Sequence, residues 1–195
     1  PDGLSIRDRK LKVARAILNG KSHKEALREA GYIEVQGIML HPDMPIDLLK
    51  NVDQAIWDSL VLNGISYMTS TSREGHGGYI SHSSGAYGMD ISAGLQEELN
   101  EKEGSFPGYK KSRINHVVAH ELGHKLWQQD LTTNQKKEVE AADTGSNYAK
   151  RIKSGDAKSA AGVAEENFCE NFAWDLTKKT TGVSESTVQA DLQEL

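Results

Sequence analysis

Residues 117–124 have the sequence VVAHELGH, and this stretch decides how the rest of the chain is interpreted. Its apolar residues, continued by Leu126, lie on the flanking faces of a helix, as they do in a helix buried in a protein core. We therefore expect a buried helix over residues 112–128. His120 and His124 are four residues apart, so both imidazoles project from one side of this helix, one turn apart.

Two imidazoles placed in this way form a zinc-binding pair, because both reach one ion at about 2.0–2.1 Å. Glu121 lies about 100° around the helix from His120, where its carboxylate can contact a zinc-bound water without binding the ion. Zinc lowers the pKa of such a water to about 7. The pattern thus predicts Zn²⁺ bound by His120 and His124, with Glu121 as general base. His116 shares the stripe, but Val117 follows it instead of a carboxylate, so we interpret His116 as structural.

A catalytic zinc ion usually has three protein ligands. No histidine follows His124, so a carboxylate must complete the set. Glu166 and Glu170 are one turn apart on a predicted helix over residues 164–178, and such a pair can supply one ligand and one acceptor for a ligand imidazole. Helix geometry leaves open which glutamate is the ligand, and a solvated acidic helix start is the alternative reading. The apolar stripe that would dock this helix consists of Phe168, Phe172 and Leu176.

With these two helices, the chain resembles the catalytic domain of anthrax lethal factor and the related Pro-Pro endopeptidases, which are zinc metallopeptidases of the zincin (gluzincin) type. Those enzymes pair HExxH with a downstream Glu-x-Phe-Ala-Glu-x-Phe helix. Residues 166–172 are the counterpart here, with Cys169 replacing the alanine. The resemblance covers roughly residues 45–178. It implies that Glu166 is the third zinc ligand and that Glu170 is its supporting carboxylate.

The family also has a tyrosine about seven residues before the ligand glutamate, which stabilises the oxyanion. Ser159 stands at that position in this chain, and Tyr148 is the nearest upstream tyrosine. We therefore take Tyr148 as the candidate catalytic tyrosine, with Tyr87 and His82 as further candidates for the same role.

The segments around residues 77–79 and 89–91 are similar to the strands that precede the active-site helix in this family. There, an edge strand lines the substrate groove. The resemblance thus implies that an extended peptide would bind along this hairpin. Tyr79, His82 and Tyr87 are its candidate substrate-binding residues.

The remaining elements follow from periodicity and turn signals, such as Asn63-Gly64 after an apolar helix and Ser83–Ala86 between two strands. We expect helices over 45–62, 134–152 and 184–195, strands over 65–69, 79–82 and 87–91, and connecting segments over 33–44, 75–78 and 154–163. Together with the two motif helices, these elements predict an α+β, zincin-like metallopeptidase domain over residues 41–195. It would have a small mixed sheet, an active-site helix beneath the sheet and a helical C-terminal part.

The first 40 residues form a predicted helical segment of different composition. Residues 1–30 hold eight Lys and Arg against four Asp and Glu. Ser22 and Glu25 have capping-box spacing, and Gly31 is a helix-stop residue. Two short helices joined by a turn resemble a helix-turn-helix, and residues 19–32 are faintly similar to the N-terminus of phage terminase small subunits. We favour a helical hairpin packed on the main domain, with nucleic-acid binding through residues 5–30 as the alternative.

Composition narrows the choice of function. The net charge is −5 and the hydrophobic content is 37%. No apolar run approaches the roughly 18 residues of a membrane span, and no signal segment opens the chain. Cys169 is the only cysteine, so an internal disulfide is excluded. We expect a protein or peptide substrate and no membrane partner, in a cytoplasmic, phage-associated or secreted setting.

The favoured function is therefore a zinc-dependent endopeptidase that hydrolyses peptide bonds by a zinc-activated water. One rival is a catalytically silent zincin-like protein of a phage or mobile element, with a structural or DNA-binding role. A second rival is a purely structural zinc site, which would normally have four protein ligands. The sequence offers no evident fourth ligand.

Overall fold

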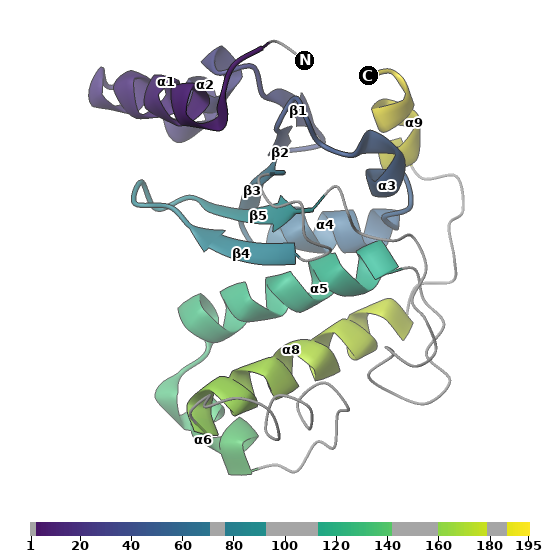
Figure 1. The fold of residues 1–195 in the computed structure, drawn as a ribbon. Helices are drawn as coiled ribbons and strands as arrows, with labels where there is room; N and C mark the ends of the chain where they lie inside the picture. Colours follow the sequence, from purple (N-terminus) through teal and green to yellow (C-terminus); the bar gives the residue numbers. More distant parts are fainter. Residues whose placement is uncertain (1–2, 71–76, 93–112, 142–159, 179–186) are drawn as a thin grey trace.

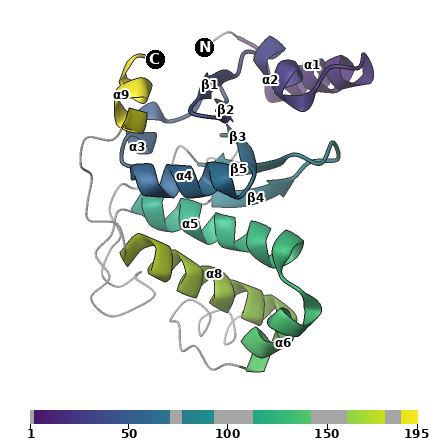
Figure 2. The same cartoon turned by 180° about the vertical axis from the view of Figure 1, so that it is seen from behind.

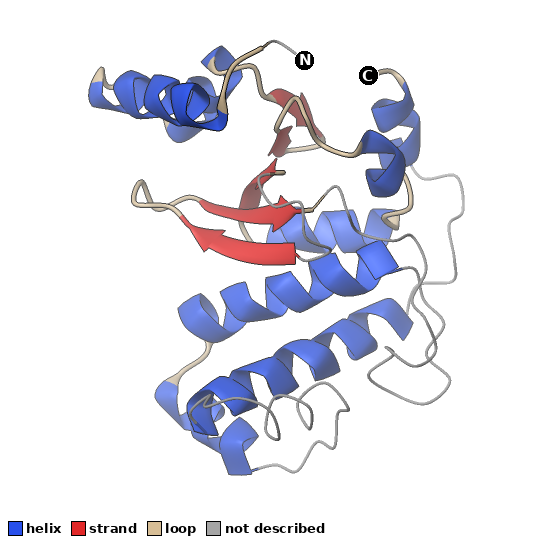
Figure 3. Ribbon diagram, viewed as in Figure 1, coloured by secondary structure: helices blue, strands red, loops and turns tan. Residues whose placement is uncertain are grey.

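The computed structural model describes residues 3–70, 77–92, 113–141, 160–178 and 187–195. Within these ranges the chain folds into a mixed five-stranded sheet with helices packed on both faces (Figure 1). The predicted α+β class with a small mixed sheet is thereby confirmed. Figure 3 shows the sheet between the N-terminal helices on one side and the two motif helices on the other. No helix in the described part of the chain is long and apolar enough to cross a membrane.

The strands are β1 (Ile33–Val35), β2 (Ile38–Leu40), β3 (Ile65–Thr69), β4 (Gly77–Ser81) and β5 (Tyr87–Ile91), arranged in the order β1-β2-β3-β5-β4. The β2–β3 and β3–β5 pairs are parallel, whereas β1–β2 and β4–β5 are antiparallel hairpins. The predicted hairpin is therefore confirmed, and β4 starts two residues earlier than expected. Among the described strands, β4 has a neighbour on one side only, so it is an edge strand.

The helices are α1 (Ile6–Leu18), α2 (His23–Glu29), α3 (Ile46–Leu49), α4 (Gln54–Leu62), α5 (Arg113–Lys125), α6 (Thr133–Ala141), α8 (Ala160–Lys178) and α9 (Thr187–Gln193). A short π-helical segment, η1 (Leu126–Asp130), continues directly from α5. Seen from behind, α4 lies level with β4 and β5, α5 runs below the sheet, and α8 lies against α5 on the side away from the sheet (Figure 2).

The α5 helix is buried on two sides. Its residues Ile114, Val118 and Leu122 recur every four positions, are fully buried and join the core beneath the sheet. Each of these apolar residues is followed two positions later by a histidine, namely His116, His120 or His124. Because each residue advances the helix by about 100°, the histidines lie on nearly the opposite side. One face of α5 therefore packs on the sheet, and the other faces α8.

The helices α5 and α8 approach closely at Gly123. A β-carbon on this glycine would lie 2.8 Å from the backbone Cα of Cys169, so any side chain there would force the helices apart. The predicted docking stripe of α8 is also in place. Phe168 packs against the ring of Trp127, while Phe172 and Leu176 pack against the main core. This close, fixed contact determines how the polar side chains of the two helices meet.

The N-terminal hairpin, α1 with α2, packs on the other face of the sheet. Its apolar residues Val13, Ala16 and Leu27 form a second core with Met39 and Tyr67 of the strands. The capping box at Ser22 is present, as predicted. The structure thus supports the packed-hairpin interpretation. The predicted domain boundary between residues 40 and 41 does not divide the sheet, because β1 and β2 precede it and the other strands follow it.

Two further predicted connecting segments were wrong in part. Residues 33–44 were expected to be a connector, but they contain β1 and β2. The turn between them has positive φ at both Gln36 and Gly37, the geometry of a tight hairpin turn that usually carries Asn-Gly or Asp-Gly. The connector expected over 154–163 gives way to α8 at residue 160, and the part of the predicted 134–152 helix beyond residue 141 lies outside the described residues.

The single helix expected over residues 45–62 is divided into α3 and α4. Asn115 of α5 stabilises the break between them. Its side-chain oxygen accepts from the backbone N–H of Asp53 at 2.9 Å, and its side-chain nitrogen donates to the carbonyl of Asn51, also at 2.9 Å. These contacts span more than 60 residues, so local periodicity gives no signal for the break.

Candidate metal centre

The predicted ligand residues meet between α5 and α8. The Nε2 atom of His120 lies 3.0 Å from Oε2 of Glu166, and the Nε2 atom of His124 lies 3.6 Å from Oε1 of the same carboxylate. His120 and Glu166 are buried, and His124 is half-buried. One carboxylate therefore faces the same nitrogen of both imidazoles.

Two other carboxylates of α8 lie beside the opposite ring nitrogens. The Nδ1 atom of His120 lies 3.3 Å from Oε1 of Glu170, and the Nδ1 atom of His124 lies 2.8 Å from Oε1 of Glu165. A carboxylate at Nδ1 favours a proton on that nitrogen, which directs the Nε2 lone pair toward a ligand. Both histidines are thus oriented with Nε2 toward Glu166.

Glu165 is a member of this cluster that the sequence interpretation missed. It lies about 100° around α8 from the side that Glu166 and Glu170 share. In the structure its Oε1 atom also accepts from Nε2 of Gln128, one turn beyond His124, at 2.9 Å. His124 and Gln128 are two donors at i and i+4 on the facing helix. This spacing was the signal in the sequence that could have indicated an acidic partner.

His116 also reaches the centre. Its Nε2 atom lies 2.9 Å from Oε2 of Glu170, and its side chain is buried in the same interface. The described histidines and glutamates of the two helices therefore form one continuous row of contacts, which runs from His116 through Glu170, His120, Glu166 and His124 to Glu165.

The charges in this row are strongly coupled. Burial opposes protonation of His120, but hydrogen bonds to Glu166 and Glu170 outweigh it and raise the pKa of His120 to about 10. The pKa of His124 is raised in the same way, against burial, by Glu166 and Glu165. Burial would raise the pKa values of Glu166 and Glu170, but contacts with the histidines lower both instead. The carboxylates therefore favour the protonated form of the two histidines.

The residues fit a zinc ion by the chemistry of their donors. Two imidazole nitrogens and a carboxylate oxygen are the ligand types that zinc takes in catalytic sites, and further carboxylates hold the imidazoles. In the structure the Glu166 carboxylate pairs directly with the imidazoles that would share the ion.

Other donor combinations lie in the same cluster. The donor atoms of His120, His124 and Cys169 lie within 4.8 Å of one another, as do those of His116, His120 and Glu170. Cys169 is fully buried, and burial, together with Glu166 and other nearby carboxylates, raises the pKa of its thiol.

Glu121 lies on the side of α5 that faces the edge strand β4. Its carboxylate accepts a hydrogen bond from the backbone N–H of Tyr79, and burial is the main factor that raises its pKa, against His120 and His124. Gly77 permits this close approach, because a β-carbon there would lie 2.5 Å from Val117 Cγ1 and 3.3 Å from Glu121 Cγ. The predicted base is therefore beside both the histidines and an edge strand.

The candidate substrate-binding residues separate into two groups. The hydroxyl groups of Tyr79 and Tyr87 lie beyond the end of α5, where Gln129 contacts them at 3.3 and 3.5 Å. His82 lies in the turn of the hairpin, where its Nδ1 accepts from the backbone N–H of Ser84. Its ring is 4.6 Å from that of His23 in α2, on the side of the N-terminal hairpin. The candidate catalytic Tyr148 lies outside the described residues.

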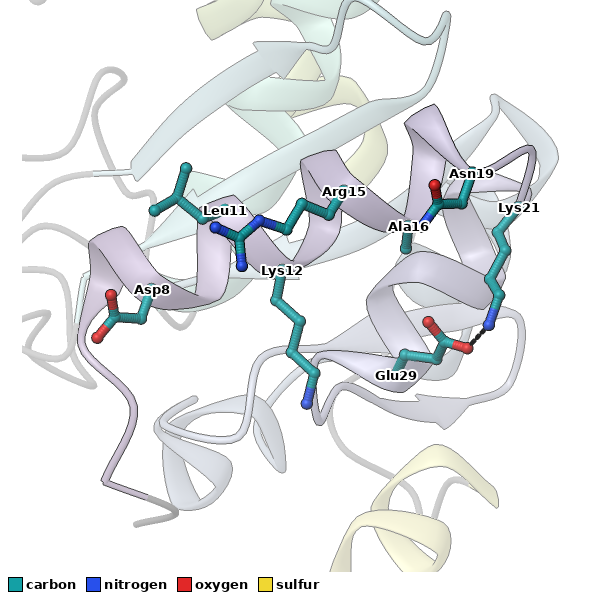
Figure 4. Close-up of a pocket in the computed structure, with 8 residues that line it drawn as sticks. All are labelled: Asp8, Leu11, Lys12, Arg15, Ala16, Asn19, Lys21 and Glu29. Atoms are coloured by element: carbon teal, nitrogen blue, oxygen red, sulfur yellow. Dashed lines mark hydrogen bonds and ion pairs between the residues drawn. The ribbon is translucent and has the colours of Figure 1, made fainter.

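Two hollows lie by the N-terminal hairpin. One, of about 680 Å³, is between this hairpin and the sheet and is lined by Tyr32, Tyr67 and Ile80 among others. The other, of about 530 Å³, runs along α1 (Figure 4). Its cations Lys12, Arg15 and Lys21 are accompanied by Asp8 and Glu29, and Lys21 pairs with Glu29. The charge of this second hollow is therefore mixed and not uniformly basic.

Comparison of the chain with protein-family models, with curated proteins and with solved structures found no match. A function is therefore inferred from the chain's own residues.

Proposed function

We propose that this chain is a zinc-dependent endopeptidase with a zincin-like fold. The observation that carries the proposal is the position of Glu166, whose two carboxylate oxygens face Nε2 of His120 and Nε2 of His124. These three residues would hold the ion, with Glu170 and Glu165 orienting the two imidazoles from behind. When bound, zinc supplies Lewis acidity, which acidifies a water molecule and polarises a carbonyl oxygen.

Glu121 supplies the proton transfer in this proposal. Its carboxylate lies one residue after His120 and beside β4, near both the histidines and the strand. It would take a proton from the attacking water at its carboxylate oxygen and later deliver that proton to the leaving amine. Burial raises its pKa, which strengthens it as a base relative to an exposed carboxylate.

The edge strand β4 is the proposed binding site for substrate. An extended peptide can add to a strand edge through main-chain hydrogen bonds, and β4 is an edge strand among the described strands. The contact of Glu121 with Tyr79 ties this edge to the catalytic helix. A protein or peptide is therefore the proposed substrate, and Tyr79 is the better placed of the candidate binding residues.

The rival proposal is a silent zincin-like protein with a structural or DNA-binding role. Such a protein would not need the Glu121 carboxylate for its function. The test is a peptide-library digest by zinc-loaded wild-type protein and by Glu121→Gln. We expect cleavage by the wild type and a loss of about 10²–10⁴-fold in the variant, with zinc content unchanged. Equal cleavage by both proteins would refute the assignment of the base, and no cleavage by a zinc-loaded wild type would favour the silent protein.

A further inference from the structure

His116 lies one turn before His120 on α5, and both contact the same carboxylate. The Nε2 atom of His116 is 2.9 Å from Oε2 of Glu170, while Oε1 of Glu170 is 3.3 Å from Nδ1 of His120. The side chains of His116, Glu170 and His120 are 11%, 5% and 10% exposed, so bulk water has little access to them. Glu170 thus links one imidazole of the proposed metal centre to one outside it.

A carboxylate that is held at a single oxygen can still rotate about its last bond. The contact with His116 fixes the second oxygen of Glu170 and therefore the plane of the whole group. In that plane, Oε1 lies 3.3 Å from Nδ1 of His120, within ion-pair distance but without the geometry of a hydrogen bond, and Nε2 of His120 faces Glu166. The orientation of His120 thus depends on a residue that does not touch the proposed ion.

We propose that His116 is a positioning residue of the metal centre, which acts through Glu170 to hold the His120 imidazole with Nε2 toward the ion. This inference rests on the proposed zinc site and assigns His116 a role in its affinity. The competing explanation is that His116 is a buried side chain that only fills space between α5 and α8. The two explanations differ because positioning requires Glu170, whereas filling space does not.

The experiment measures zinc dissociation constants by chelator competition for the wild type, His116→Leu, Glu170→Ala and the double variant. A direct partner of a ligand imidazole typically contributes about 10–100-fold in metal affinity. We expect His116→Leu to weaken zinc binding by about 5-fold, less than a direct partner, because it acts through one more side chain. In the Glu170→Ala background the same substitution should have no further effect, because residues that act through one contact are not additive.

Three variants control for folding and chemistry. His116→Gln should bind zinc almost as the wild type does, because its amide nitrogen can replace Nε2–H as a donor to Glu170. His116→Asn should weaken zinc binding as His116→Leu does, because its shorter amide does not reach Glu170. This variant replaces His116→Leu in the experiment if the leucine variant does not fold. His41→Leu removes another buried imidazole, 6% exposed and in contact with Tyr32, and should leave zinc affinity unchanged.

The outcomes separate the two proposals. A wild-type protein that binds no zinc would overturn the metal centre and the role of His116 with it. Zinc binding that is unaffected by His116→Leu and His116→Asn would overturn the positioning role alone. So would an equal loss with and without Glu170, or a loss in His41→Leu as large as that in His116→Leu.

Discussion

The Nδ1 atom of His124 lies 2.8 Å from Oε1 of Glu165, a direct contact between α5 and α8. This contact orients the second histidine of the HExxH motif as Glu170 orients the first. It also adds a third carboxylate of α8 to a cluster in which Glu166 and Glu170 were the predicted participants. The two helices therefore meet through a row of alternating acidic and basic side chains.

Glu165 should contribute to zinc affinity through His124. Glu165→Ala removes the acceptor at Nδ1, and we expect zinc affinity to fall by about 10-fold, at the lower end of the range for such partners because the contact is partly exposed. Glu165→Gln retains a carbonyl oxygen that can accept from Nδ1, so its zinc affinity should stay close to that of the wild type. Chelator competition measures both, and equal affinities for wild type and Glu165→Ala would contradict the role.

The alanine variants of Glu166 and Glu170 should differ in how they affect zinc binding. Glu166→Ala removes a proposed ligand and leaves two histidines, so the variant should lose zinc on dialysis. Glu170→Ala removes a support of His120, so it should retain zinc with affinity or activity lowered by about 10–100-fold. Metal analysis after dialysis of each variant decides between them. The reverse result, with Glu170→Ala the weaker binder, would invert the assignment.

Gly77 and Gly78 are adjacent in β4 but should respond differently to alanine. A β-carbon at Gly77 would lie 2.5 Å from Val117 Cγ1, whereas at Gly78 its nearest neighbour is Asp90 Cβ at 3.9 Å. Gly77→Ala must push β4 away from α5, so we expect about 1–3 kcal/mol of lost stability and reduced cleavage. Gly78→Ala is the matched control and should be close to neutral in chemical denaturation. Equal losses would mean that β4 does not pack on α5 as described.

His23 should make the fold sensitive to acid. Burial, aided by the nearby His82, lowers the pKa of His23 to about 4, from an unfolded value of 6.5. The folded state therefore holds this imidazole neutral. Its contribution to stability is complete above about pH 6.5 and is lost as the pH falls toward 4, because the unfolded chain binds the proton first.

The measurement is Tm at pH 7 and pH 4.5 for metal-free wild type and His23→Gln. The variant lacks the titrating group, so its Tm should fall less between the two pH values. A fall in Tm that is the same in both proteins would show that His23 titrates normally in the fold.

The parts of the fold that sequence predicted best are those with a strong local signal. β3 and β5 begin and end at the predicted residues. Asn63-Gly64 ends the helix before β3, and the Ser83–Ala86 turn separates β4 from β5, so both strands have a clear start in the sequence. The motif helix was predicted from VVAHELGH because its apolar and polar residues recur at helical spacing. These signals lie within a few residues of the elements that they predict.

The parts that were missed depend on contacts between distant segments. The break between α3 and α4 is stabilised by Asn115, more than 60 residues away in the chain. The role of Glu165 depends on how α8 is rotated against α5, which the close contact of Gly123 with Cys169 fixes. No spacing within a single helix carries that information.

Zinc stoichiometry tests the central claim most directly. The protein would be stripped of metal, reconstituted with excess zinc, dialysed and analysed for metal, with His120→Ala and His124→Ala treated in parallel. We predict about one zinc ion per wild-type chain and little or none in either variant, since a catalytic zinc ion needs three protein ligands. A folded wild-type protein that retains no zinc after this treatment would contradict the account.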